Sequence, residues 1–180
     1  MKRIGSLLFA LSLITGAYAA DDVAGAVHGT IKKIDAAGKT VVIATADGTE
    51  KTLHIGKEAS VHGVDATAKG AKESWNGLKE GTEVVAHYTR RGSEDTAVEF
   101  DKVGKDGLKA TEGTVKEVDR SGKKLVITAV DGTEHTFHLT DHAARDSGKD
   151  LTAGTEKGTK VVVYSTEDAG KKVAHFFEKV

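Results

Sequence analysis

The sequence contains no cysteine and no proline, and its only methionine is the initiator. Without cysteine the chain has no disulfide framework, so each folded unit must be held together by a hydrophobic core. The lack of further methionine removes the soft thioether ligands that favour Cu(I). The lack of proline is compatible with strands that pair without interruption.

Charge and aromatic content argue against nucleic acid as a partner. Lysine and arginine total 26 against 27 aspartates and glutamates, which gives a formal net charge of −1. No basic patch is therefore available to attract a phosphate backbone. One tryptophan, three tyrosines and five phenylalanines are few for a surface that stacks single-stranded bases. We expect no nucleic-acid partner.

Residues 1–19 have the organisation of a secretory signal peptide. Lys2 and Arg3 form a positive start, residues 7–14 form a short apolar run, and residues 17–19 read Ala-Tyr-Ala, the small-residue pattern of a cleavage site. The apolar run is too short to span a bilayer, so we expect no membrane insertion after cleavage. The mature protein is expected in the periplasm or outside the cell.

The dominant feature of the sequence is an internal duplication. Residues 29–55 recur as residues 113–139 at an offset of 84, and 14 of the 27 aligned residues are identical. Both copies contain a Gly-Thr start, a Val-Ile pair, an Asp-Gly-Thr-Glu turn and a Thr-x-His. Identity of this extent indicates two related domains, which we place at residues 20–104 and 105–180.

Each copy predicts five short β-strands. Apolar residues alternate with polar ones in the first three candidates, and an Asp-Gly pair between the second and third favours a tight hairpin turn. An alanine- and lysine-rich segment at residues 65–75 then predicts a short helix, and two more strands follow. The strand candidates of the first copy are residues 26–34, 39–46, 50–55, 83–89 and 96–103.

A three-strand meander, an interruption and a final hairpin form the strand plan of an OB-type barrel. An SH3-like barrel is the alternative, since it also has five short strands. The second copy is seven residues shorter at the interruption, because the offset falls from 84 to 77, and the helix can be reduced there to a turn at residues 140–144. We therefore predict an all-β protein of two tandem five-stranded barrels, OB-like or SH3-like, with a short helix or turn between strands three and four.

The repeated Gly-x-(Ile/Val)-x-x-(Ile/Val)-Asp start and the Asp-Gly turn resemble small periplasmic barrel domains of bacteria whose function is unknown. The resemblance covers both copies and implies the barrel fold without implying an activity. The same barrel class includes periplasmic copper chaperones of the CusF type, which bind Cu(I) through a histidine, two methionines and a tryptophan. The methionine ligands are absent here, and Trp75 lies outside a matching motif, so the resemblance does not carry that role over.

Histidine is the one enriched residue type with ligand chemistry, with eight in the chain. His135, His138 and His142 are clustered, which suggests a site for Zn or Cu(II). His135 and His138 are three residues apart on a predicted strand and so face opposite sides. His138 and His142 converge if the chain turns between them, and Asp141 would then add an oxygen ligand. His54 is the counterpart of His138 in the first copy.

The aromatic residues divide into core and surface candidates. Trp75, Tyr88 and Tyr164 are candidates for surface contacts, although Trp75 is better interpreted as a plug over one end of the first barrel. The core candidates are Phe100, Phe137 and Phe177.

The sequence carries no catalytic motif: it has no G-x-S-x-G, no H-E-x-x-H, no nucleophilic cysteine and no phosphate-binding glycine loop. We therefore expect a protein that is not an enzyme and needs no cofactor. Two hypotheses follow. The chain is either an accessory module of the cell envelope that binds another envelope protein, or a periplasmic protein that binds Zn or Cu through its histidines.

Overall fold

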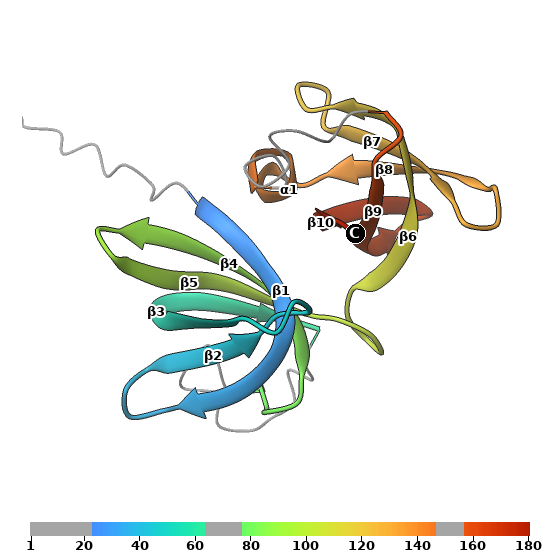
Figure 1. Ribbon diagram of the computed structural model, residues 1–180. Coiled ribbons are helices and arrows are strands. Elements are labelled where there is room, and N and C mark those ends of the chain that lie inside the picture. The colour runs from blue at the N-terminus through green and yellow to red at the C-terminus, as the bar shows by residue number, and fades with distance from the viewer. Residues whose placement is uncertain (1–22, 64–76, 147–156) are drawn as a thin grey trace, which may run out of the picture.

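A computed structural model describes residues 23–63, 77–146 and 157–180, and it consists of two closed β-barrels (Figure 1). The all-β, two-barrel fold predicted from the sequence is confirmed. The predicted signal peptide, the predicted helix at residues 65–75 and Trp75 all lie outside the described residues.

The strands agree with the predicted ones in number and order, but β3 continues well beyond its predicted end at residue 55. The first barrel consists of β1 (Val23–Asp35), β2 (Thr40–Ala44), β3 (Glu50–His62), β4 (Glu83–Arg91) and β5 (Glu94–Lys102). The second consists of β6 (Lys109–Asp119), β7 (Lys124–Ala129), β8 (Glu134–Leu139), helix α1 (Asp141–Asp146), β9 (Lys160–Asp168) and β10 (Lys171–Lys179).

Strand pairing decides between the two predicted barrel types. The first barrel has the order β1-β2-β3-β5-β4 and closes between β4 and β1, and the second repeats this order. The third and fifth strands of each barrel run parallel, whereas all other neighbours are antiparallel. This is the order of an OB barrel, so the chain consists of two tandem OB-like barrels.

Between its third and fourth strands the second copy has the short helix α1, one of the two alternatives predicted there, a short helix or a turn. The Thr140 hydroxyl accepts a hydrogen bond from the Ala143 amide at 3.0 Å, which caps the start of α1. The Thr140 amide donates to the Ala174 carbonyl of β10. Ala143 is fully buried against the barrel interior, so packing and capping compensate for the shortness of the segment.

Each barrel has its own hydrophobic interior, formed by equivalent residues of the two copies. The three phenylalanines assigned to the core, Phe100, Phe137 and Phe177, are at most 1% exposed. The interior of the first barrel includes Ile31, Val41, Ile43, Leu53 and Phe100, and that of the second includes Val115, Leu125, Ile127, Phe137 and Phe177.

A third apolar cluster joins the two barrels, and we call this contact the seam. It contains Ala26 and Val85 from the first barrel, Leu108, and Tyr164 and Phe176 from the second. Tyr164 is 3% exposed, so it lies inside the seam and not on the surface that the sequence suggested.

Tyr88 has a different position. It is partly buried and packs against the first barrel's own core. At the offset of 77 that relates these strands, His87 and not Tyr88 is the counterpart of Tyr164. This explains why the two tyrosines have different environments.

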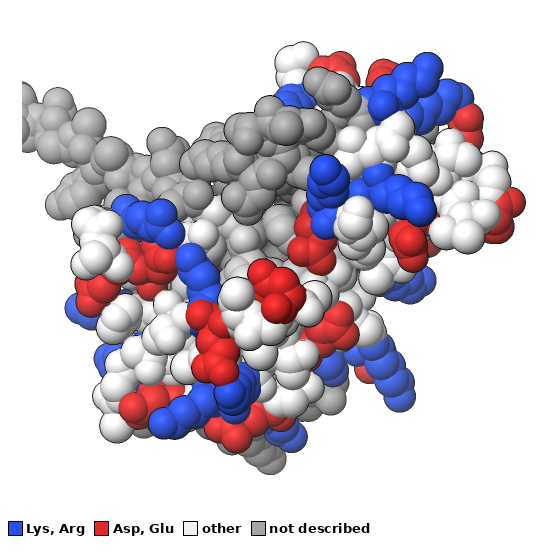
Figure 2. Space-filling model, in the orientation of Figure 1, with Lys and Arg blue, Asp and Glu red and all other residues white. Residues whose placement is uncertain are grey.

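On the face shown in Figure 2, lysines and arginines are interspersed with aspartates and glutamates. No helix among the described residues is long and apolar enough to cross a membrane.

Replacing Gly29 with Ala should destabilise the first barrel by about 1–3 kcal/mol. A Cβ at this position would lie 2.3 Å from the Ala44 carbonyl oxygen, and a backbone atom of a paired strand cannot easily move away. Urea unfolding measures the loss. Thr30→Ala, at the exposed next position of β1, is the control and should cost less than about 0.5 kcal/mol. Equal losses for the two variants would contradict this explanation of the repeated glycine.

Candidate metal centre

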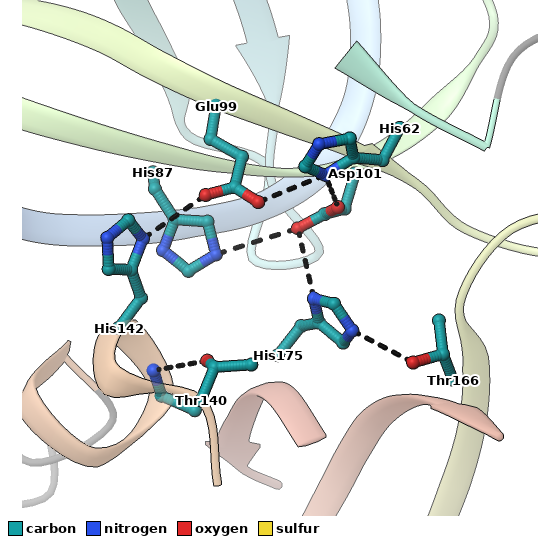
Figure 3. A network of polar contacts seen from close by, with 9 residues as sticks. His62, His87, Glu99, Asp101, Thr140, His142, Thr166 and His175 are labelled. Carbon is teal, nitrogen blue, oxygen red and sulfur yellow. Dashed lines mark hydrogen bonds and ion pairs between the residues drawn. The ribbon is translucent and has the colours of Figure 1, made fainter. Parts of the chain in front are cut away.

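Histidines and carboxylates from both barrels converge within the seam (Figure 3). These residues belong to strands and a helix that are separate in the sequence and that the fold brings together. The first barrel contributes His62 from β3, His87 from β4, and Glu99 and Asp101 from β5, while the second contributes His142 from α1 and His175 from β10.

Strand register explains the arrangement in the first barrel. Glu99 and Asp101 are two residues apart on β5 and share its outer face, while Phe100 between them points into the core. Glu99 lies opposite His87 on β4, and Asp101 lies opposite His62 on β3. The extension of β3 beyond residue 55 is therefore what brings His62 to the carboxylates.

A β-bulge explains the position of His175 in the second barrel. In the ladder between β9 and β10, Ala174 and Phe176 of β10 each pair with a residue of β9, but His175 between them is left without a paired residue. Bulges of this kind redirect a side chain, and His175 points from β10 toward Asp101 in Figure 3. Its Nε2 lies 3.0 Å from Thr166 Oγ1, which holds the ring in one orientation.

Helix α1 places the remaining histidine. His142 is in the first turn of α1, directly after the Thr140 cap. Its Nδ1 lies 3.2 Å from Glu99 Oε2, and its ring centroid lies 5.3 Å from that of His87. This ion pair crosses the seam, because α1 belongs to the second barrel and β5 to the first.

Three of these residues form the tightest group. His62 Nδ1 lies 3.1 Å from Glu99 Oε1 and 3.0 Å from Asp101 Oδ1. Within the described part of the chain, they are the one set of His and carboxylate ligands whose atoms all lie within 4.8 Å of one another.

Asp101 is the least solvated member of the group. Its side chain is 1% exposed, and its Oδ2 is buried without a hydrogen-bond partner. Two imidazole nitrogens, His87 Nε2 and His175 Nδ1, each lie 3.8 Å from this oxygen. This distance is too long for a hydrogen bond. Because an ionised carboxylate is costly to bury without compensation, the position calls for a cation or a proton.

Burial also affects His175. It lowers the pKa of the ring below its ordinary value, although the negative charges of Asp101 and Glu99 act in the opposite direction. A lowered pKa favours the neutral imidazole.

Two cavities adjoin the cluster and provide room for a hydrated ion to approach. One, of about 250 Å³, is lined by His62, Asp101, Thr166 and His175 together with part of the connection between the barrels. The other, of about 190 Å³, is lined by residues that include His87, Glu99 and His142.

Of the five ligands suggested by the sequence, the structure places His142 in this cluster and Asp141 beside it. Asp141 lines the smaller cavity and forms an ion pair with Lys123. His138 is exposed on β8. None of the five belongs to the tight group of three in the described residues.

The other two suggested histidines have separate neighbours. His135 Nδ1 lies 2.8 Å from Lys172 Nζ, and His54 Nε2 lies 3.4 Å from Glu94 Oε1. The sequence therefore identified one residue of the cluster, His142, through its proximity to other histidines along the chain. It missed His62, His87, Glu99, Asp101 and His175, which only the barrel packing brings together.

One signal in the sequence could have found part of the site. The copies differ where their strands should be equivalent, and these differences coincide with the seam. At the offset of 77, His87 corresponds to Tyr164 and Asp101 corresponds to Glu178. Polar residues at positions that face outward on both barrels, yet differ between the copies, are candidates for an asymmetric site.

A separate polar network crosses the seam around His28. Its Nε2 lies 2.8 Å from Glu83 Oε1, and its Nδ1 lies 2.9 Å from Glu178 Oε1. The Tyr164 hydroxyl donates to Glu178 at 2.8 Å. Burial by itself would lower the pKa of His28, but the hydrogen bonds to Glu178 and Glu83 outweigh it and raise the pKa above its ordinary value. Burial likewise raises the pKa of Tyr164, and the bond to Glu178 adds to this effect.

No protein-family model matches the chain, and no curated protein matches its sequence. The function must therefore be argued from the geometry of the site.

Replacing His28 with Gln should remove part of the pH dependence of folding. Because its pKa is raised in the folded state, the stabilisation is complete below the unfolded pKa of about 6.5 and is lost as pH rises through the folded value. Urea unfolding with a chelator, from about pH 5 to 9, should show that the advantage of the natural protein over His28→Gln shrinks as pH rises.

The matched control for this experiment is His138→Gln, which changes an exposed ring on β8. Its pH profile should follow that of the natural protein. An advantage over His28→Gln that grows with pH would show that the ring is held neutral, against this interpretation.

Proposed function

We propose that this protein is an exported, non-catalytic metal-binding protein of the cell envelope, which holds a divalent transition metal ion, Zn²⁺ or Cu²⁺, in the seam between its barrels. The ligands are His62, Glu99 and Asp101. The observation that carries the proposal is the buried Asp101 carboxylate, which has one oxygen without a hydrogen bond and imidazole nitrogens on several sides.

The donor set favours this class of metal. Imidazole and carboxylate ligands suit Zn²⁺ and Cu²⁺, whereas the soft ligands of Cu(I) are absent from the chain. Donor atoms around a tetrahedral zinc ion lie about 3.4 Å apart. The separations of 3.0 and 3.1 Å between His62 and the two carboxylates are close to this spacing, so small side-chain movements suffice.

A metal ion also accounts for the electrostatics. Asp101 and Glu99 place two negative charges next to each other, and their side chains are 1% and 18% exposed, whereas His62 beside them is 56% exposed. Their mutual repulsion and desolvation cost free energy that a divalent cation offsets. Protonation of the neighbouring histidines is the competing way to compensate these charges, and metal binding would displace those protons.

Export is supported by the signal-like organisation of residues 1–19. The resemblance of both copies to small periplasmic barrel domains supports the same location. Histidine and carboxylate ligands suit a protein that binds metal ions outside the cytoplasm, because they are not damaged by oxidation as thiols are.

The rival hypothesis, docking of another envelope protein, has weaker support among the described residues. Every strand pairs on both sides within its closed barrel, so none of these strands offers an edge to a partner. The apolar seam is filled by the chain's own side chains.

Asp101→Asn should weaken Zn²⁺ binding at least about 100-fold, because it removes a charged ligand while keeping the shape of the side chain. Isothermal titration of chelator-treated full chain with Zn²⁺, and separately with Cu²⁺, measures the affinity and should give one ion per chain in the natural protein. His62→Ala should also weaken binding, whereas the exposed-site control His138→Ala should not. Absence of binding to the natural chain, or an equal loss in the control, would refute the proposal.

The same substitution should have the opposite effect on the metal-free protein. Asp101→Asn removes a buried charge, so without metal the variant should be more stable than the natural protein by about 1 kcal/mol. Urea unfolding in the presence of a chelator measures this difference. A large loss of stability would mean that Asp101 acts mainly as a structural hydrogen-bond acceptor.

A further inference from the structure

We infer that the metal ion is shared between the two barrels: His175 of the second barrel adds a ligand to the ion held by His62, Glu99 and Asp101 of the first, so that metal loading fastens the seam. This inference rests on the proposed function and assigns a further ligand and a structural consequence to the same site.

The contacts of His175 favour a cation beside it. Its Nε2 is 3.0 Å from Thr166 Oγ1, while its Nδ1 faces Asp101 Oδ2 at 3.8 Å. When Nε2–H donates to Thr166, Nδ1 carries a lone pair that points toward an oxygen which itself has no hydrogen bond. Two facing acceptors repel each other unless a cation lies between them. A hydrogen-bond partner on the far ring nitrogen is the usual support of a metal-binding histidine.

The separation also fits a shared ion. At 3.8 Å, Nδ1 and Oδ2 are too far apart for a hydrogen bond but only slightly farther apart than the roughly 3.4 Å between ligands of a tetrahedral ion. A movement of a few tenths of an ångström across the seam would complete the site.

Comparison of the two copies shows how the second barrel comes to have an imidazole at this position. Both barrels have the same bulge. In the β4–β5 ladder, Ala97 and Glu99 of β5 each pair with a residue of β4 and Val98 is left unpaired, just as His175 is left unpaired in the β9–β10 ladder. Val98 and His175 are equivalent at the offset of 77. The β-bulge is therefore present in both barrels, but only the second copy has a histidine at the bulged position.

A second contact across the seam, between Glu99 and His142, also links the two barrels. Glu99 uses Oε1 toward His62 of its own barrel and Oε2 toward His142 of the other. Asp101 likewise uses Oδ1 toward His62 of its own barrel, while its Oδ2 lies 3.8 Å both from His87 of its own barrel and from His175 of the second. An ion bound by these carboxylates would draw the two barrels together.

The absence of cysteine from the chain permits a direct distance measurement. Spin labels at Thr52→Cys and Thr136→Cys occupy equivalent exposed strand positions, one on each barrel. Double electron–electron resonance spectroscopy should show that Zn²⁺ narrows the distribution of distances between the two spin labels in the otherwise natural chain. The chelator should reverse the narrowing.

His175→Gln tests the assignment, since it keeps the size of the side chain but removes the imidazole. Zinc affinity should fall at least about tenfold and the narrowing should disappear. Thr166→Val leaves the imidazole in place and should lower affinity about tenfold through loss of its orientation. His135→Gln, a partly buried histidine on β8 of the same barrel, is the control and should change neither readout.

The outcomes separate this inference from the proposed function. If the natural chain binds Zn²⁺ and His175→Gln binds it equally tightly with the same narrowing, the ion belongs to the first barrel alone and sharing is refuted. If the natural chain binds no Zn²⁺, the proposed function itself fails. Folding of each variant is checked by its far-ultraviolet circular dichroism, and Thr166→Val keeps the inference testable should His175→Gln fail to fold.

Discussion

Burial of the outward faces of equivalent strands against each other is the constraint on which the arrangement of this protein depends. Each barrel closes on its own core, so its outer surface would normally be solvated. Here β1, β4 and β5 of the first barrel meet α1, β9 and β10 of the second, and Val85, Tyr164 and Phe176 form part of an apolar cluster between them. Polar residues on the same faces are consequently removed from water, and their unusual environments follow from this packing.

The cost of that burial is unevenly distributed. Around His28 every polar atom that faces the seam has a partner, because two carboxylates and the Tyr164 hydroxyl surround the ring. Around Asp101 one carboxylate oxygen has none. A buried acceptor without a partner costs free energy that a nearby cation offsets, and this cost is the basis of the metal site proposed above. The two networks in the seam therefore differ in how completely their polar atoms are paired.

Divergence between the copies produces the candidate site. A perfectly repeated pair of barrels would present the same residues from both sides, and a carboxylate would meet a carboxylate. Instead, the first copy supplies the two acids together with His62 and His87, and the second adds His175 on a bulge that the first copy also has. The pairs that differ in this way are His87 with Tyr164, Val98 with His175, Glu99 with Phe176 and Asp101 with Glu178.

The sequence by itself determined the duplication, the number and order of the strands and the core phenylalanines, because alternation and turn residues are local properties of a strand. It identified only His142 and the neighbouring Asp141 near the site, since it could weigh histidines only by their spacing along the chain. The tertiary structure decided the rest. Asp101 meets His62 through strand register and meets His175 through the packing of one barrel on the other, and neither distance is encoded in any short stretch of sequence.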